Sequence, residues 1–150
     1  MSAAGHAAEN APCITLTDSF LESASDLQRN DAKRVSAFLG KLLVEPTASG
    51  LRPEIVKDAH DRSIRSYRVS REMRAVAQLE GRDATFLYVG PHEKAYAWAK
   101  AHCIECQLGR HSVRLADADE PGRQLREWEC VDHEQLCDLL DSHGVAHELR

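Results

Sequence analysis

Aromatic residues make up only 5% of this 150-residue chain, and no apolar run is long enough to cross a membrane. Hydrophobic residues nevertheless reach 43%, so the chain can build a core that is mostly aliphatic. Residues 1–12 lack the basic and apolar segments of a secretion signal, and their Ala, Gly and polar content predicts a disordered leader. We therefore expect one ordinary domain, no membrane association and a cytoplasmic location.

The net charge of −5 is unevenly distributed along the chain. Residues 13–102 carry 14 Lys and Arg against 12 Asp and Glu, whereas residues 103–150 carry 5 against 11. A basic stretch on a near-neutral body favours a nucleic-acid site, while an acidic tail opposes phosphate binding. The alternative interpretation of the basic stretch is a solvated strand face. Its basic side chains are Arg52, Lys57, Arg62, Arg65, Arg68, Arg71 and Arg74.

Three strands are predicted in the middle of the chain. Residues 64–69 and 73–79 alternate between apolar and polar side chains, and residues 84–89 are apolar enough for a buried central strand. Gly81 supplies turn chemistry between the last two. We therefore predict a three-stranded antiparallel meander that carries arginines, with His92 opening a helix after its last strand.

The segments on either side of the meander complete an α+β fold. Residues 13–17 are rich in β-branched side chains and predict a strand, and apolar residues at helical spacing predict two helices before Pro46. We expect these two N-terminal helices to pack on the antiparallel sheet. Residues 103–150 predict a small α/β extension, in which Asp132 caps a helix and Gly144 ends it. The acidic extension packs either beside the arginines or on the far side.

Three motifs, taken together and in order, resemble the RelE/ParE toxin superfamily. They are PEIVK at 53–57, SYRVSREMRAV at 66–76 and VGPHEKAY at 89–96, and they lie closest to the YoeB-like branch of ribosome-dependent mRNA endonucleases. The resemblance covers residues 13–102. It implies a RelE/ParE-like fold, cleavage of mRNA at the ribosome, and a cognate antitoxin as partner.

The same resemblance assigns roles to individual residues. It implies that Glu54, His92 and Arg74 are catalytic, and that RNA is bound by Lys57, Arg65, Arg68 and Tyr96. In metal-independent cleavage the 2′-hydroxyl attacks the neighbouring phosphate, so a base, an acid and cations are needed. Glutamate can take the 2′ proton, histidine titrates near neutrality and can protonate the 5′ oxygen, and arginines can stabilise the charge that develops. Tyr96 is displaced by a few positions from the usual place of the family's tyrosine.

A second interpretation needs no catalysis. Residues 92–99 and 128–145 also resemble RelE-like domains that occur with superfamily I helicases, and ParE-like relatives bind gyrase. The alternative function is therefore a non-catalytic interaction module, either gyrase-binding or associated with a helicase. Taken one at a time, the candidate site residues fit an ordinary solvated surface.

The cysteines suggest one further site. Cys103 and Cys106 are followed by Cys130 and His133, which is a spacing compatible with tetrahedral zinc. The glycine and proline usual in zinc knuckles are missing here, and buried reduced thiols are the alternative. Our main expectation is that the protein needs no cofactor.

Overall fold

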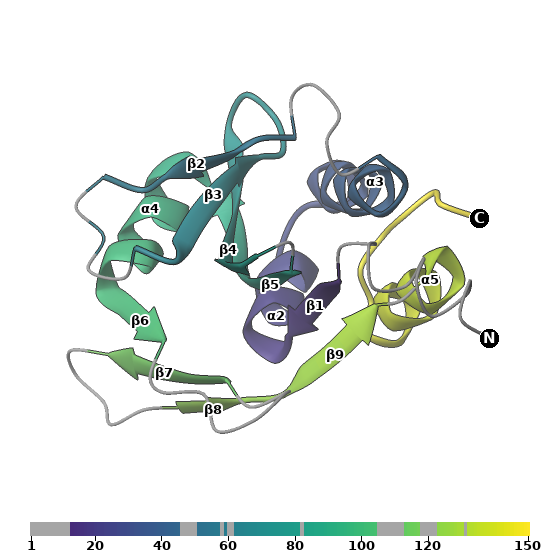
Figure 1. The fold of residues 1–150 in the computed structure, drawn as a ribbon. Helices are drawn as coiled ribbons and strands as arrows, with labels where there is room; N and C mark the ends of the chain where they lie inside the picture. Colours follow the sequence, from purple (N-terminus) through teal and green to yellow (C-terminus); the bar gives the residue numbers. More distant parts are fainter. Residues whose placement is uncertain are drawn as a thin grey trace.

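The computed structural model describes residues 13–45, 51–57, 59, 62–81, 83–104, 113–117, 123–130 and 132–150. The fold is α+β: helices pack on a six-stranded sheet of order β2-β3-β4-β5-β1-β9, and a separate sheet has the order β6-β7-β8 (Figure 1). The strands are β1 Ile14–Thr17, β2 Pro53–Ile55, β3 Ile64–Arg68, β4 Met73–Glu80, β5 Asp83–Pro91, β6 His102–Ile104, β7 Val113–Asp117, β8 Arg123–Leu125 and β9 Glu127–Cys130. The helices are α2 Asp18–Ser25, α3 Arg29–Val44, α4 His92–Ala101 and α5 His133–Ser142.

The predicted meander is confirmed as β3, β4 and β5, which pair antiparallel in that order. Gly81 connects the last two strands with a φ of 64°, in the left-handed region that glycine adopts without penalty. A bulge lies at Leu87 of β5, because the consecutive residues Val76 and Ala77 of β4 pair with Tyr88 and Phe86. The short strand β2, which was not predicted, pairs antiparallel with β3.

The expectation of a purely antiparallel sheet is wrong at β1, because β1 pairs parallel with β5 and the sheet is mixed. The long connection through α2 and α3 gives the chain room to return in the same direction. All four residues of β1 are buried. The Thr17 hydroxyl donates to the Phe86 carbonyl at 2.7 Å, and the Ser19 hydroxyl donates to the Leu87 carbonyl at 2.6 Å. These bonds tie the start of α2 to β5.

The larger core lies on one face of the sheet, between its strands and the helices α2, α3 and α5. Thr17 caps α2 by accepting a bond from the Phe20 backbone N–H. Phe20, Phe38 and Tyr67 surround Phe86 with ring centroids 5.5–6.0 Å from its own. All three phenylalanines and Tyr67 therefore meet at the centre of this core, on the side of the sheet that we call the main-core face.

Helix α4 packs on the opposite face of the sheet, over β4 and β5. The core there is small and consists of Val56, Ile64, Val76, Ala95 and Ala99. Half-buried aromatic side chains surround it rather than fully buried ones. We call this side the α4 face.

The C-terminal segment completes the main sheet. Strand β9 pairs antiparallel with β1, and Leu136, Leu139 and Leu140 of α5 join the main core. The predicted capping box of α5 is present, and Gly144 has a φ of 71° just after the helix. Figure 1 shows β9 and α5 at the edge of the sheet opposite to β2, so these two elements lie away from the arginine-bearing strands β3 and β4. Among the helices described, none is both long and apolar enough to cross a bilayer.

Candidate functional site

Two arginines stand next to each other at one end of the sheet. Arg68 of β3 pairs in register with Arg74 of β4, which in turn pairs with Gly90 of β5. Directly paired residues project from the same face. Arg52 precedes Pro53, whose register partner is Tyr67, so Arg52 lies at the same end of β2. The arrangement collects positive charge where β5 leads into α4.

Alternation along the strands places this arginine pair on the α4 face. Arg68 has the same parity as Ile64 and Arg74 the same parity as Val76, and both apolar residues belong to the small core beneath α4. The Arg68 side chain is exposed, while Arg74 is half-buried. The pair therefore borders α4 and stays accessible.

His92 is the first residue of α4 and lies beside the same strand ends. Its backbone N–H donates to the Glu72 carbonyl at 2.8 Å, which holds the start of the helix against the start of β4. Its exposed ring stacks on Tyr96, one turn along, with 4.2 Å between centroids. The Tyr96 hydroxyl lies 3.5 Å from the Ser66 hydroxyl on β3. Stacking and this contact fix the direction in which the histidine ring faces.

Glu54 joins the group through β2. It pairs in register with Ser66, so the two side chains project from the same face with Cβ atoms about 5 Å apart. Glu54, Ser66, Tyr96 and His92 thus lie one after another across the α4 face. Lys57 lies two residues beyond β2 and is exposed. Ser66 was not among the predicted site residues, although its alternation with Arg68 places it on this face.

Part of the Arg74 guanidinium already has a structural role. Its Nη1 donates to the carbonyls of Ser70 at 2.8 Å, Met73 at 3.0 Å and Arg71 at 3.4 Å, and so closes the turn between β3 and β4. A guanidinium has five N–H donors. Its other nitrogens make no bond to a residue that the structure describes, and they remain available to an anion.

Arg65 is not brought to this group. It pairs with Ala77 and has the same parity as Tyr67, so it projects toward the main-core face. Its Nη1 donates to the carbonyls of Arg62 and Ile64. The alternation of residues 64–69 already separated Arg65 from Arg68, and this should have removed it from the predicted set.

The first turn of α4 adds to the positive potential. Its N-cap is Pro91, which makes no side-chain bond to the helix, so the first backbone N–H groups are not capped by a side chain. Helix N-termini carry a partial positive charge and favour anions. This end of α4 borders the arginine pair.

A stacked array that the sequence did not predict extends the α4 face. Tyr88 stacks on Trp98 at 5.6 Å, and Trp98 stacks on His102 at 4.1 Å, with interplanar angles of 13° and 14°. Tyr88 also lies over Gly90, where an added Cβ would meet its ring at 3.1 Å. The glycine thus leaves room for the Tyr88 ring on this face.

The predicted zinc site lies largely outside the described residues. Cys106 is not described, and the side chains of Cys103 and Cys130 are not described either. The His133 ring bonds to the Leu149 carbonyl at 2.8 Å. Within the described part of the chain, no group of three or more His, Cys, Asp or Glu residues is arranged to hold a metal.

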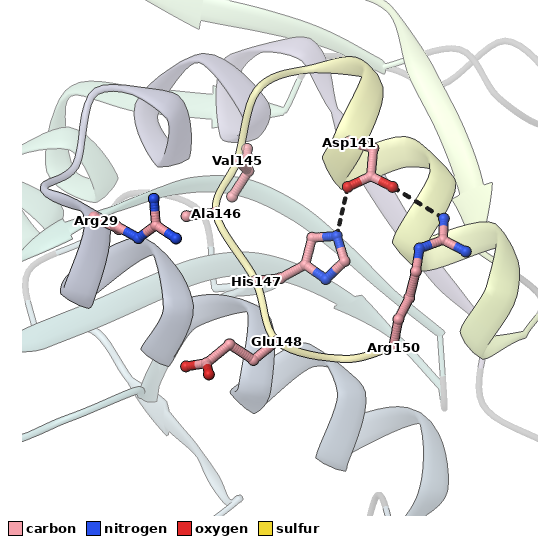
Figure 2. A pocket seen from close by; sticks show the side chains of 7 residues that line it. All are labelled: Arg29, Asp141, Val145, Ala146, His147, Glu148 and Arg150. Carbon is pink, nitrogen blue, oxygen red and sulfur yellow. Dashed lines mark hydrogen bonds and ion pairs between the residues drawn. The ribbon is translucent and has the colours of Figure 1, made fainter.

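A separate pocket of about 380 Å³ is formed by the C-terminal residues and Arg29 (Figure 2). Its polar groups already bind one another. His147 Nε2 lies 2.6 Å from Asp141 Oδ1, and Arg150 lies 3.0 Å from Asp141 Oδ2 (Figure 2). The His147 bond, followed by that of Arg150, lowers the pKa of Asp141. Because both bonds join the C-terminal residues to Asp141, the arrangement is a clasp that fastens the C-terminus to α5.

Comparison with known protein families finds no family model that matches this chain, and no curated protein matches it.

Proposed function

We propose that the α4 face is the active site of a metal-independent endoribonuclease of the RelE/ParE type. The observation that carries the proposal is the path from Glu54 through Ser66 and Tyr96 to His92, beside the Arg68–Arg74 pair. A carboxylate and an imidazole across one basic surface are the groups that acid–base cleavage of a phosphodiester needs. We further propose that α2 and α3, packed on the main sheet, correspond to the two N-terminal helices of that superfamily.

In the proposed reaction, Glu54 removes the proton from a ribose 2′-hydroxyl. The 2′ oxygen attacks the adjacent phosphorus, the bond from phosphorus to the 5′ oxygen breaks, and His92 donates its proton to that oxygen. The products are a 2′,3′-cyclic phosphate and a 5′-hydroxyl. Arg68, the free nitrogens of Arg74 and the first turn of α4 stabilise the negative charge that builds on the phosphoryl oxygens. The role of Lys57 is to bind a neighbouring phosphate.

The half-buried aromatic side chains fit the same substrate. Single-stranded RNA is commonly held by basic groups along its backbone and by aromatic rings against its bases. The Tyr96 ring lies between His92 and Ser66, and Tyr88 lies beside Gly90. We propose mRNA on the ribosome as the substrate and a cognate antitoxin as the regulatory partner.

A second candidate function is a non-catalytic interaction module, which would bind gyrase or serve a helicase. The observation that favours it is the use of Arg74 Nη1 to close its own turn. These bonds give Arg74 a structural role that does not depend on binding a substrate. In this alternative Glu54 and His92 are ordinary exposed side chains.

The two functions are separated by expressing the protein in cells and mapping RNA 5′ ends. We expect growth inhibition and new 5′-hydroxyl ends that can be ligated only after phosphorylation by a kinase. The variant His92→Gln is expected to lower cleavage by about 10²- to 10⁴-fold, the usual contribution of a positioned acid.

His133→Gln is the matched control, because His133 is also the exposed first residue of a helix but lies on α5. It is expected to retain full cleavage. Wild-type protein that yields no new ends, or a His92→Gln variant that cleaves as well as His133→Gln, would favour the interaction module.

A further inference from the structure

A basic cavity lies near the end of β3, next to the proposed site. It measures about 360 Å³ and is bordered by Arg34 and Lys41 of α3 together with Arg68. Its apolar lining includes Phe38, Leu51 and Val69. Among the residues that the structure describes, no carboxylate lines it. Its volume is within the range of ligand sites, about 300–1,000 Å³.

The positive charges at this cavity are mostly not compensated. Arg34 lies 3.5 Å from Asp31 in an exposed pair one turn apart, and such a pair contributes little. Lys41 and Arg68 form no ion pair with any residue that the structure describes. Three like charges around one cavity repel one another, and a bound anion would relieve that repulsion.

The spacing of the charges favours a chain of phosphates over a single one. Arg34 and Lys41 are seven residues apart on α3, which is about 10.5 Å along the helix axis. A single phosphate would contact both only if the two long side chains converged on it, whereas an extended polyanion can contact both without such convergence. Phe38 is 6% exposed, so no open ring face is offered to a base. The cavity therefore suits the backbone of a strand rather than its bases.

Arg68 connects the cavity to the proposed active site, because it borders the cavity and also pairs with Arg74. We propose that the cavity is a second binding site for the RNA backbone, held by Lys41, Arg34 and Arg68. The strand passes from the α4 face around the end of β3 to α3. This inference rests on the proposed function and extends the bound length of its substrate.

The test is the salt dependence of binding to a fluorescently labelled oligouridine, measured by anisotropy with the full chain. For single strands, each phosphate contact contributes about 0.7 to the slope of log K against log salt concentration. Lys41→Gln is expected to weaken binding and to lower the slope by about 0.7. Lys33→Gln removes the same charge from α3, but Lys33 pairs with Glu148 at 3.4 Å, so its slope should equal that of the wild type.

Equal slopes for wild type, Lys41→Gln and Lys33→Gln would overturn the proposal. It is also overturned if Lys41→Gln weakens binding of labelled polyglutamate but not of RNA, since the cavity would then dock an acidic protein segment. The outcome is separable from that of the nuclease assay. If RNA is cleaved but the slope does not depend on Lys41, only the proposal of a second binding site is contradicted. If the slope depends on Lys41 but RNA is not cleaved, only the proposed nuclease activity is contradicted.

Discussion

The two faces of the main sheet differ in how completely they are filled. On the main-core face three helices cover a continuous apolar core, and Phe20, Leu39 and Phe86 have no exposed surface. On the α4 face one helix covers a small core, and the surrounding aromatic and basic side chains remain half-buried or exposed. One face buries most of the apolar core, and the other leaves basic side chains exposed.

The difference follows from the residues that each strand presents. Ala75 and Ala77 of β4 face the main core, while the same strand presents Arg74 and Val76 to α4. The period of two in a strand lets one segment serve both purposes. Substitutions should therefore separate into those that unfold the protein and those that disable the proposed site.

Phe86→Ala is expected to have the largest effect on stability. It removes a fully buried ring that contacts Phe20, Phe38 and Tyr67, and such truncations cost about 3–5 kcal/mol. His92→Ala, at an exposed position on the other face, should change the free energy of unfolding by less than about 0.5 kcal/mol. Urea unfolding measures both. Similar losses of unfolding free energy for the two variants would contradict the proposed difference between the faces.

Cys13 tests whether β9 belongs to the main sheet. Its thiol donates to Glu129 of β9 at 2.9 Å, and burial followed by this bond raises the pKa of Cys13 from 9.0 to about 12. Below pH 9 the thiolate fraction of Cys13 is about 10³ lower than that of a cysteine with the ordinary pKa. A thiolate of higher pKa is intrinsically more nucleophilic, which recovers part of that loss. Alkylation of Cys13 should therefore be roughly 50-fold slower than that of free cysteine. Mass spectrometry of the Cys13 peptide measures the rate.

Because the folded pKa of Cys13 is raised, its contribution to stability is complete below pH 9 and is lost as the pH rises toward 12. Glu129→Gln removes the charge and should speed alkylation. Reaction of wild-type Cys13 at the rate of a free cysteine would show that β9 is not held against β1.

Substitutions of Arg74 and Arg68 should change the free energy of unfolding by different amounts, although the two residues are register partners. Arg74→Ala removes the bonds that close the turn and is expected to cost about 1 kcal/mol. Arg68→Ala should change stability by less than about 0.5 kcal/mol, because the side chain is exposed. Both variants should bind RNA more weakly. Equal stabilities in urea would mean that the turn does not depend on Arg74.

The smallest effect is expected at the C-terminal clasp. The pKa of Asp141 lies below 3.8 because His147 and then Arg150 bond to it, so its stabilising contribution is present above pH 3.8 and is lost as the pH falls through the folded value. Asp141→Asn should be less stable than wild type at pH 5, and the difference should disappear at the acid end. Thermal unfolding between pH 5 and pH 2.5 measures it. A stability difference between wild type and Asp141→Asn that stays constant with pH would show that the ionised carboxylate does not stabilise the fold.

Local elements were predictable from the sequence because short-range chemistry determines them. The strands of the meander follow their alternation, and the cap of α5 follows from Asp132 and Gln135 three residues apart. The parallel pairing of β1 with β5 was not predictable, since residues 14–17 carry no signal of direction. Strand β2 was missed because three exposed residues show no usable pattern.

The candidate site was predicted in part. Register brings Glu54, Arg68 and Arg74 to the α4 face, and α4 brings His92 there, although no motif specified the linking role of Ser66. The bulge in β5 and the stacking of Tyr88 on Trp98 depend on long-range packing. Lys41 was not among the residues predicted for a site, and its place beside Arg68 needed the fold.

The most direct test of the account is the chemistry of the cleaved ends. A defined mRNA is incubated with the protein in a translation reaction, and the fragments are identified by mass spectrometry. We predict 2′,3′-cyclic phosphate and 5′-hydroxyl ends that are strongly reduced with Glu54→Gln and with His92→Gln, while His133→Gln leaves them unchanged. Fragments with 3′-hydroxyl and 5′-phosphate ends, or no fragments at all, would contradict the account.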